Sequence, residues 1–216
     1  MVKVMVHISY NVDGADRTTS ICYIALAANK RGFELKRSQL AREVVEILVI
    51  TGLIFLVVRF VIQSYHIDGP SMQPGLTTNE YVMVNKVVYL FHAPERGDVI
   101  VFHYPHDTTQ DYIKRVVGLP GDTIETDNTR VWVNGTLLKE PYISSPFNQQ
   151  ASKWKVPADQ YFVMGDNRPA SDDSRSWGFV PRDYIVGKAA TVFWPLPQFH
   201  FINTYSNVYT GIKGDN

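Results

Sequence analysis

The sequence is poor in cysteine and carries no net charge. Its only thiol, Cys22, has no second cysteine with which to form an intramolecular disulfide or a zinc knuckle. Twenty-one basic residues balance twenty-one acidic ones, and a chain without net charge is not steered toward nucleic acid by its overall field. We therefore expect stability to come from packing, and we expect no nucleic-acid partner.

The sequence also lacks an internal repeat, a Gly/Ser linker and a low-complexity tract. Its 216 residues are 45% hydrophobic and 19% charged, which are ordinary values for a globular protein. These values argue against disorder of the whole chain, and the length suffices for one domain with an appendage.

One long apolar run is present, from Val44 to Ile62. As a helix, its nineteen residues extend about 28 Å, close to the roughly 30 Å of a bilayer's hydrocarbon core. Glu46 and Arg59 lie near its two ends, where long charged side chains reach the lipid headgroups. We expect a transmembrane helix over residues 44–62. The uncharged centre, residues 47–58, also has the length of a buried core helix, which is the alternative.

Basic residues concentrate before this run and predict its orientation. The excess of Lys and Arg predicts a cytoplasmic N-terminal tail over residues 1–43 and an extracytoplasmic domain over residues 63–216. We therefore expect a single-pass protein of the cell membrane. A cleavable signal peptide fits less well, because Gln63-Ser64-Tyr65-His66 lacks the small-x-small pattern of a cleavage site. The basic residues are Lys30, Arg31, Lys36, Arg37 and Arg42.

Beyond the apolar run, short β-branched and aromatic stretches alternate with turn residues, which indicates a mainly β domain. The pair Asn134-Gly135 favours a tight hairpin turn, and the residues after Pro195 carry only weak signals for regular structure. The expected strands are Tyr81 to Tyr89, Asp98 to Tyr104, Tyr112 to Gly118, Thr123 to Thr126, Arg130 to Val133, Gln160 to Met164 and Ile185 to Trp194.

Three polar segments of this domain hold candidate catalytic groups: residues 69–74, 112–122 and 165–175. Each has an ordinary interpretation when taken alone. Ser71 between two prolines reads as an exposed turn serine, Lys114 as an edge-strand charge, and the third segment as a solvated loop.

Together, and after an apolar span, the three segments resemble the motif set of the type I signal peptidases, which are Ser/Lys proteases of family S26. The resemblance extends from about Arg42 to Trp194. Two positions depart from the family pattern: Gly75 replaces a threonine, and Gly69 stands where some members place a serine hydroxyl for the oxyanion hole. The matching boxes are Ser71-Met72-Gln73-Pro74-Gly75-Leu76, Lys114-Arg115-Val116-Val117-Gly118-Leu119-Pro120-Gly121-Asp122, and Gly165-Asp166-Asn167-Arg168 with Ser171, Asp173 and Arg175.

This resemblance implies a signal-peptidase-like β-barrel or sandwich after one N-terminal transmembrane helix. It implies a membrane-bound serine endopeptidase that removes signal peptides from exported preproteins, cutting after small residues in an Ala-x-Ala-like pattern. Ser71 is then the nucleophile, Lys114 the general base, and no cofactor or metal is needed. The Ser171 hydroxyl is expected to orient the Lys114 amine. Ion pairs of Asp166 with Arg115 and of Asp173 with Arg175 are expected to hold the loop that carries Ser171.

The chemistry of lysine agrees with this role. A serine hydroxyl needs a base to become a nucleophile, and no histidine here lies in a triad motif. Lowering the lysine pKa from about 10.4 to about 7 to 8 disfavours the charged form by roughly 4 kcal/mol, which burial achieves. Lys114 has apolar neighbours on its expected strand.

The family binds its substrate as an extended strand paired to a strand edge. We expect a shallow apolar wall beside the nucleophile. Its expected members, which are alternatively ordinary core residues, are Ile67, Met72, Tyr112 and Ile113.

Two other patterns carry less weight. Ser152-Lys153-Trp154-Lys155 matches the Ser-x-x-Lys pattern of penicillin-binding proteins, but Ser-Asp-Asn and Lys-Thr-Gly are both missing. His103, His106 and Asp107 have no further ligand cluster nearby in the sequence, so we expect no metal.

Two alternative functions stay open at this point. A self-cleaving repressor-type Ser/Lys protein shares a related fold, but the chain has no recognisable helix-turn-helix and carries an apolar span. A membrane-anchored β-domain that binds peptides without cutting them is the other alternative, and the intact Ser71, Lys114 and Ser171 argue against it.

Overall fold

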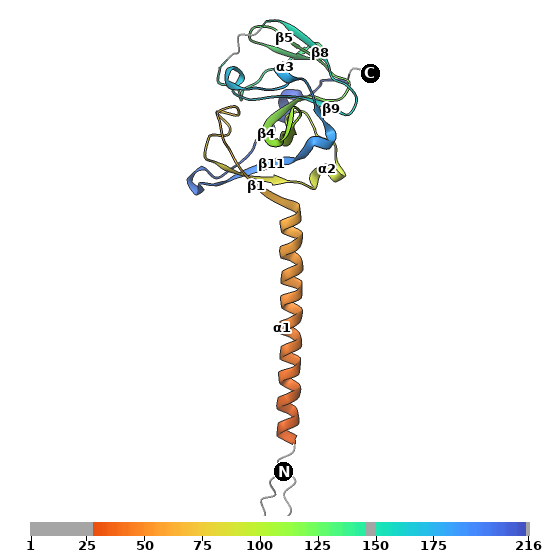
Figure 1. The fold of residues 1–216 in the computed structure, drawn as a ribbon, viewed down its shortest axis with the longest axis vertical. Helices are drawn as coiled ribbons and strands as arrows, with labels where there is room; N and C mark the ends of the chain where they lie inside the picture. Colours follow the sequence, from red (N-terminus) through yellow and green to blue (C-terminus); the bar gives the residue numbers. More distant parts are fainter. Residues whose placement is uncertain (1–27, 146–149, 215–216) are drawn as a thin grey trace, which may run out of the picture. The chain divides into compact units, whose positions relative to one another are not determined.

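A computed structural model describes residues 28–145 and 150–214, so Cys22 and most of the expected tail lie outside it. The chain divides into two compact units, Met1–Phe55 and Leu56–Asn216. The described part of the first unit and the start of the second form one helix, α1 (Ala28–Val61). The second unit is a β-domain (Figure 1).

Helix α1 contains a segment long and apolar enough to cross a membrane, Gln39–Val61, and none of that segment is buried among the described residues. Leu53 is 62% exposed and Phe55 is 67% exposed. A core helix would bury one face, so this exposure argues against the core-helix alternative. The helix begins at Ala28 and not at Val44, because the intervening sequence is rich in Lys, Arg, Glu, Gln and Leu, which favour helix. Ile62, expected in the helix, begins the first strand.

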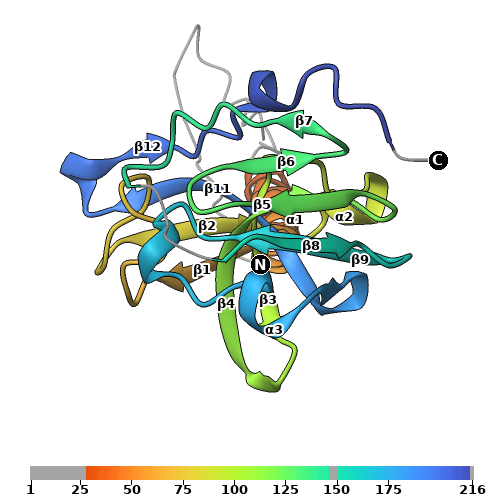
Figure 2. The ribbon, with the colours of Figure 1, turned by 90° about the horizontal axis from the view of Figure 1, so that it is seen from above.

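The β-domain contains two antiparallel sheets. The larger sheet has the order β1-β2-β11-β3-β4-β9-β10, with β12 paired to β11 beside it, and the smaller has the order β7-β6-β5-β8 (Figure 2). The strands are β1 (Ile62–His66), β2 (Tyr81–Asn85), β3 (Val99–Tyr104), β4 (Asp107–Gly118), β5 (Thr123–Thr126), β6 (Val131–Val133), β7 (Thr136–Leu137), β8 (Ser152–Lys155), β9 (Gln160–Met164), β10 (Val180–Pro181), β11 (Ile185–Trp194) and β12 (His200–Phe201). The expectation of a mainly β domain is confirmed.

Short helical segments join some of these strands. They are α2 (Val88–Phe91), η1 (Arg168–Ala170), α3 (Ser174–Trp177), η2 (Arg182–Tyr184), η3 (Leu196–Gln198) and η4 (Ser206–Tyr209).

The expected strands agree best where turn residues bracket an apolar run. Strands β5, β9 and β11 have the expected bounds, and the Asn134-Gly135 turn joins β6 to β7 with positive φ at both residues, as a tight hairpin requires. The strand expected to continue to Tyr89 stops at Asn85. The side-chain oxygen of Asn85 accepts hydrogen bonds from the N–H groups of Val87 and Val88, and these bonds turn the chain into α2.

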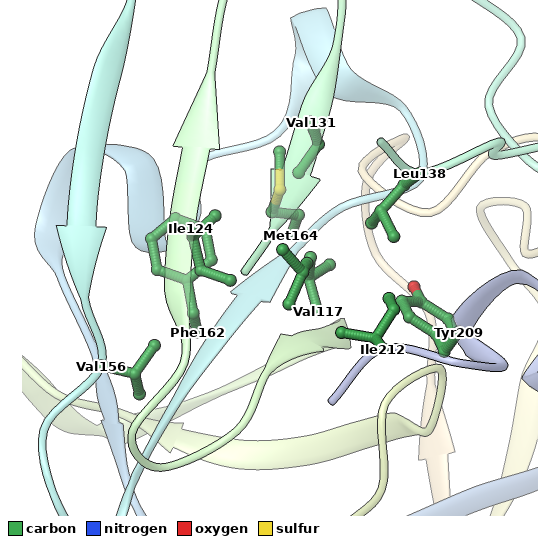
Figure 3. Packing of buried hydrophobic residues seen from close by; sticks show 10 residues of the cluster. Val117, Ile124, Val131, Leu138, Val156, Phe162, Met164, Tyr209 and Ile212 are labelled. Carbon is green, nitrogen blue, oxygen red and sulfur yellow. The ribbon is translucent and has the colours of Figure 1, made fainter. Parts of the chain in front are cut away.

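The buried apolar side chains form three clusters, one of which lies between the smaller sheet and β9 (Figure 3). That cluster includes Ile124 of β5 and Phe162 of β9, both without exposed surface. It also includes Tyr209 and Ile212, from the segment after Pro195 that carries only weak sequence signals. The C-terminal segment is therefore part of the domain core.

Candidate active site

The fold brings the three polar segments together. Ser71 lies in the turn between β1 and β2, Lys114 lies on β4, and residues 165–175 follow β9, which pairs with β4. The turn that carries Ser71 is closed by backbone hydrogen bonds from Gln73 N–H to the Pro70 carbonyl (3.1 Å) and from Leu76 N–H to the Met72 carbonyl (2.9 Å).

Ser71 and Lys114 contact each other directly. Lys114 Nζ lies 2.9 Å from Ser71 Oγ and donates a second hydrogen bond of 3.0 Å to the Ile113 carbonyl. The lysine side chain points into the domain, since the residue is only 5% exposed. The amine of Lys114 therefore lies where it can exchange a proton with the serine hydroxyl.

Burial lowers the pKa of Lys114 to about 8, although the carboxylates of Asp173, Asp172 and Asp166 act in the opposite direction. A low-dielectric environment disfavours the charged amine more than these carboxylates favour it. A large fraction of the lysine is then neutral at slightly alkaline pH, and a neutral amine has the lone pair that a base needs.

Asp166 and Arg115 form the first expected ion pair, which is buried. Arg115 Nε and Nη2 donate to the two carboxylate oxygens at 2.8 and 2.7 Å, and Nη1 donates to the carbonyls of Gly97 (2.8 Å) and Asn203 (2.9 Å). Because Arg115 follows Lys114 on β4, this network fixes the strand position of the lysine against the residues that follow β9.

Asp173 and Arg175 form the second expected pair. Arg175 Nε and Nη2 donate to the Asp173 carboxylate, each at 2.8 Å. Asp173 also accepts from the Gly165 N–H (2.9 Å) and caps helix α3 by accepting from the Arg175 N–H (3.2 Å). The pair thus ties both ends of the loop that carries Ser171.

Ser171 does not make the hydrogen bond that the family resemblance implies. Its hydroxyl is buried, and it has no hydrogen-bond partner among the described residues. The amine of Lys114 donates to Ser71 and to the Ile113 carbonyl instead. Ser171 is close to the site nonetheless, because a Cβ on Gly165 would overlap its Oγ and would lie 2.5 Å from the Ser71 carbonyl oxygen.

Two residues of segment 165–175 support the turn that carries Ser71, and the sequence did not predict this role for either. Asn167 donates through its backbone N–H to the Ser71 carbonyl and through Nδ2 to the Pro70 carbonyl, both at 3.0 Å. Gly165 provides the space between Ser71 and Ser171. Both lie inside the quoted motif, so the motif marked the segment, but only the packing assigns them these contacts.

A groove of about 380 Å³ opens beside Ser71 and Lys114. Ile67, Tyr112 and Ile113 line it, as expected for an apolar wall. Met72 does not line it. This residue is 1% exposed and lies in the core, where it borders a separate cavity of about 320 Å³.

Two strand edges border this groove. β1 pairs only with β2, and β4 pairs with β9 only from Arg115 onward, so the described strands leave one edge of each without a partner. Tyr65 at the end of β1 and Asp111 on β4 face each other, and burial together with this carboxylate raises the pKa of Tyr65 to about 12. An extended peptide could pair with such edges.

Comparison with known proteins identifies the family. The family described as Signal peptidase, peptidase S26, matches residues 40–194. The chain belongs to this family. The matched range agrees with the range over which the motifs resemble the type I signal peptidases, and it argues against the repressor-type alternative.

Named members of the signal peptidase family are similar over most of their length. Signal peptidase I of Leptolyngbya laminosa is 45% identical over 144 residues, which cover 63% of this chain and 71% of that protein. The probable signal peptidase I-1 of a Synechocystis strain is 38% identical over 178 residues, which cover 79% of this chain and 91% of that protein. A crystal structure of a signal peptidase I from Enterococcus faecalis is 37% identical and covers 45% of this chain and 97% of that one, with a TM-score of 0.41.

The chain is therefore a serine peptidase of the signal peptidase family, and its two departures from the family pattern differ in structural effect. Gly69 has a φ of 103°, in the region that favours glycine. Gly75 has no such φ, and a Cβ there would make only ordinary contacts, 3.6 Å from the Met72 carbonyl oxygen and 3.7 Å from Asp166 Oδ2. The turn of this signal peptidase would thus accept a side chain at position 75.

Proposed function

We propose that this peptidase is anchored in the cell membrane by α1 and removes signal peptides from exported preproteins with a Ser71–Lys114 dyad. The observation that carries the proposal is the 2.9 Å contact between Lys114 Nζ and Ser71 Oγ, together with the lowered pKa of that amine. A poised base in contact with a hydroxyl is the arrangement that nucleophilic catalysis by serine needs.

The reaction follows from this geometry. Neutral Lys114 removes the proton of the Ser71 hydroxyl as Oγ attacks the scissile carbonyl, and the resulting ammonium gives a proton to the leaving amine. Water then hydrolyses the acyl-enzyme with the same lysine as base. The N–H of Ser71 is our candidate donor to the oxyanion, because Gly69 offers no hydroxyl.

Substrate recognition uses the groove beside the dyad. The region around the cleavage site binds as an extended strand between the unpaired edges of β1 and β4. Side chains of that strand meet Ile67, Tyr112 and Ile113. On this proposal the peptidase cuts after small residues in an Ala-x-Ala-like pattern, with the side chains on the amino side of the cut against this apolar wall.

The support residues act by holding the dyad. The ion pair of Asp166 with Arg115 fixes the loop after β9 to β4. The ion pair of Asp173 with Arg175 holds the loop itself. The Ser171 hydroxyl is buried without a hydrogen-bond partner among the described residues. Our proposal assigns it the role of orienting Lys114 during turnover, when the amine becomes an ammonium.

Cleavage of a precursor tests the proposal. The detergent-solubilised full chain is incubated with a signal-peptide-bearing preprotein, and the new N-terminus is determined by sequencing. We expect one cut after a small residue at the end of the signal peptide. Ser71→Ala is the matched control and should leave the precursor intact. A folded wild-type protein that binds the precursor without cutting it would favour the peptide-binding alternative.

A further inference from the structure

The segment after β11 contacts the turn that carries Ser71 through a histidine side chain. His200, at the start of β12, places Nε2 3.2 Å from the Gly75 carbonyl oxygen, although the two residues are 125 positions apart. Its other ring nitrogen, Nδ1, lies 2.8 Å from the Gln198 carbonyl oxygen. His200 lies beyond residues 40–194, the range that the family matches. The family motifs therefore do not predict this contact.

The backbone of His200 is held on the larger sheet. Strand β12 pairs with β11, and His200 lies opposite Val192 (Figure 2). The hydroxyl of Thr191, a residue that is 8% exposed, donates to the His200 carbonyl at 2.7 Å. The Ile202 N–H donates to the Ala190 carbonyl at 3.0 Å. The imidazole therefore reaches the turn from a strand that its own hydrogen bonds keep in place.

The turn needs support on both sides of the nucleophile. Asn167 holds its first part, through the carbonyls of Pro70 and Ser71. Gly75, in its last part, has no side chain with which to contact the rest of the domain, and its carbonyl faces His200. Asn167 thus holds the turn before and at the nucleophile, and His200 holds it after the nucleophile.

The two carbonyls that face the imidazole decide which form of the ring makes these contacts. A carbonyl oxygen only accepts hydrogen bonds, so the contact with Gly75 requires a proton on Nε2. A neutral imidazole has one N–H and can donate either to Gln198 or to Gly75, whereas the imidazolium donates to both. The contact with Gly75 is therefore made most completely by the protonated ring.

The charged groups near the ring largely compensate each other. His200 borders the cavity of about 320 Å³, whose other titratable lining residues are Arg115, Tyr142, Asp166 and Tyr205. Arg115 and Asp166 form an ion pair with each other, and tyrosine is ordinarily neutral at physiological pH. Protonation of His200 itself is then the change to which its contact with the turn responds.

We propose that His200 is a positioning residue of this peptidase, which donates from Nε2 to the Gly75 carbonyl and holds the turn that carries Ser71 against β12, most strongly as an imidazolium. The inference rests on the proposed dyad, because displacement of the turn changes the distance between Ser71 Oγ and Lys114 Nζ. His200 acts through the backbone of Gly75 and not on the substrate.

Two substitutions at position 200 test this role in the detergent-solubilised full chain, with cleavage of a signal-peptide-bearing precursor as the assay. His200→Gln keeps an N–H donor that does not titrate, whereas His200→Leu removes the donor. At about pH 6.5 we expect His200→Leu to lower kcat by roughly tenfold with KM nearly unchanged, less than the loss that a displacement of about 1 Å causes. His200→Gln should restore most of the rate. His92→Leu, at an exposed histidine after α2, is the matched control and should keep wild-type kinetics.

The pH dependence separates positioning from a general packing effect. The ratio of wild-type kcat to that of His200→Leu should shrink as pH rises from about 6 to about 9, because imidazole ordinarily loses its charge within this range. The ratio of His200→Gln to His200→Leu should stay constant, since the amide does not titrate. Wild-type kcat in folded His200→Leu, equal losses in both variants, or a wild-type ratio that does not change with pH would overturn the proposal.

A measurement without turnover tests the contact independently of the dyad. Met72 follows Ser71 in the turn and borders the same cavity as His200. In protein labelled with ¹³C-methyl methionine, the Met72 resonance, assigned with Met72→Leu, should shift as the imidazole titrates. His200→Gln should lose this step and keep any step caused by Lys114.

The failures of the two proposals are distinguishable. Absence of the Met72 step in the folded wild-type protein would overturn the role of His200, even if the precursor is cut as proposed. An uncut precursor together with the Met72 step would contradict the proposed dyad and would still support the contact between His200 and the turn.

Discussion

Lys114 Nζ lies 2.9 Å from Ser71 Oγ, although the two residues are 43 positions apart. The lysine is on a strand whose neighbours are β3 and β9, and the serine is in a turn held by Asn167 from the loop after β9. The contact therefore depends on the relative positions of three separate segments of the chain.

Replacing the base should nearly abolish activity even when the charge is kept. Arginine stays protonated in proteins, so Lys114→Arg should lower kcat/KM by at least about a hundredfold, the usual minimum for general base catalysis. Ser71→Ala should be at least as inactive, and the double variant no worse, because the two groups act as one unit.

Lys114→Met provides a second variant in case the guanidinium does not fit the buried site, and thermal unfolding checks that each protein is folded. Substantial turnover by folded Lys114→Arg would be incompatible with the dyad.

The pH dependence of kcat/KM should follow the deprotonation of the Lys114 amine. The catalytic form of Lys114 is the deprotonated one, so kcat/KM should rise as pH increases through about 8, where the buried amine loses its proton. Asp172 raises this pKa, and Asp172→Asn should therefore move the rising limb to lower pH by a small amount, since Asp172 is exposed and its field is screened.

Asp127→Asn, at the exposed turn before β6, is the control and should leave the profile in place. A limb in the carboxylate range, or one that moves equally in both variants, would assign the titration to another group.

Ser171→Ala should change rate and not stability. The Ser171 hydroxyl has no hydrogen-bond partner among the described residues, so its removal breaks no hydrogen bond and should leave the thermal midpoint nearly unchanged. If the hydroxyl meets the lysine ammonium during turnover, kcat should fall while KM changes little. Wild-type kcat in this variant would remove Ser171 from the mechanism.

Gly165→Ala should displace the turn that carries Ser71 or the loop that carries Ser171. The added Cβ would overlap Ser171 Oγ and lie 2.5 Å from the Ser71 carbonyl oxygen, so the nucleophile turn or the loop must move. We expect a lower melting temperature and a loss of activity of about a hundredfold, as displacements of about 1 Å cause.

Gly75→Ala is the matched control, because a Cβ there makes only ordinary contacts. Equal effects of the two substitutions would show that overlap at position 165 is not the cause.

The orientation of the span should follow the charge of its flanks. The basic residues before the apolar run predict a cytoplasmic N-terminus. Protease added to intact spheroplasts should digest the β-domain or its exposed loops and spare an N-terminal tag, which becomes accessible only after lysis. Digestion of the tag alone would reverse the orientation.

Local sequence signals were sufficient for much of the fold. Strands β5, β9 and β11 begin and end as expected, because their boundaries are set by neighbouring turn residues and by alternation within a few positions. The early start of α1 and the end of β2 at Asn85 were not expected. The first depends on helix propensity outside the apolar run, and the second on a side-chain hydrogen bond to the backbone.

The sequence by itself determined which chemical groups are present, their motif spacing, and the apolar run long enough to cross a membrane. Only the tertiary structure decided that Lys114 is buried, that Met72 faces the core instead of the groove, that the Ser171 hydroxyl has no partner, and that Ile212 belongs to the core. The reason is that a pattern is local, whereas desolvation and hydrogen bonding sum contributions from atoms that folding brings together from distant positions.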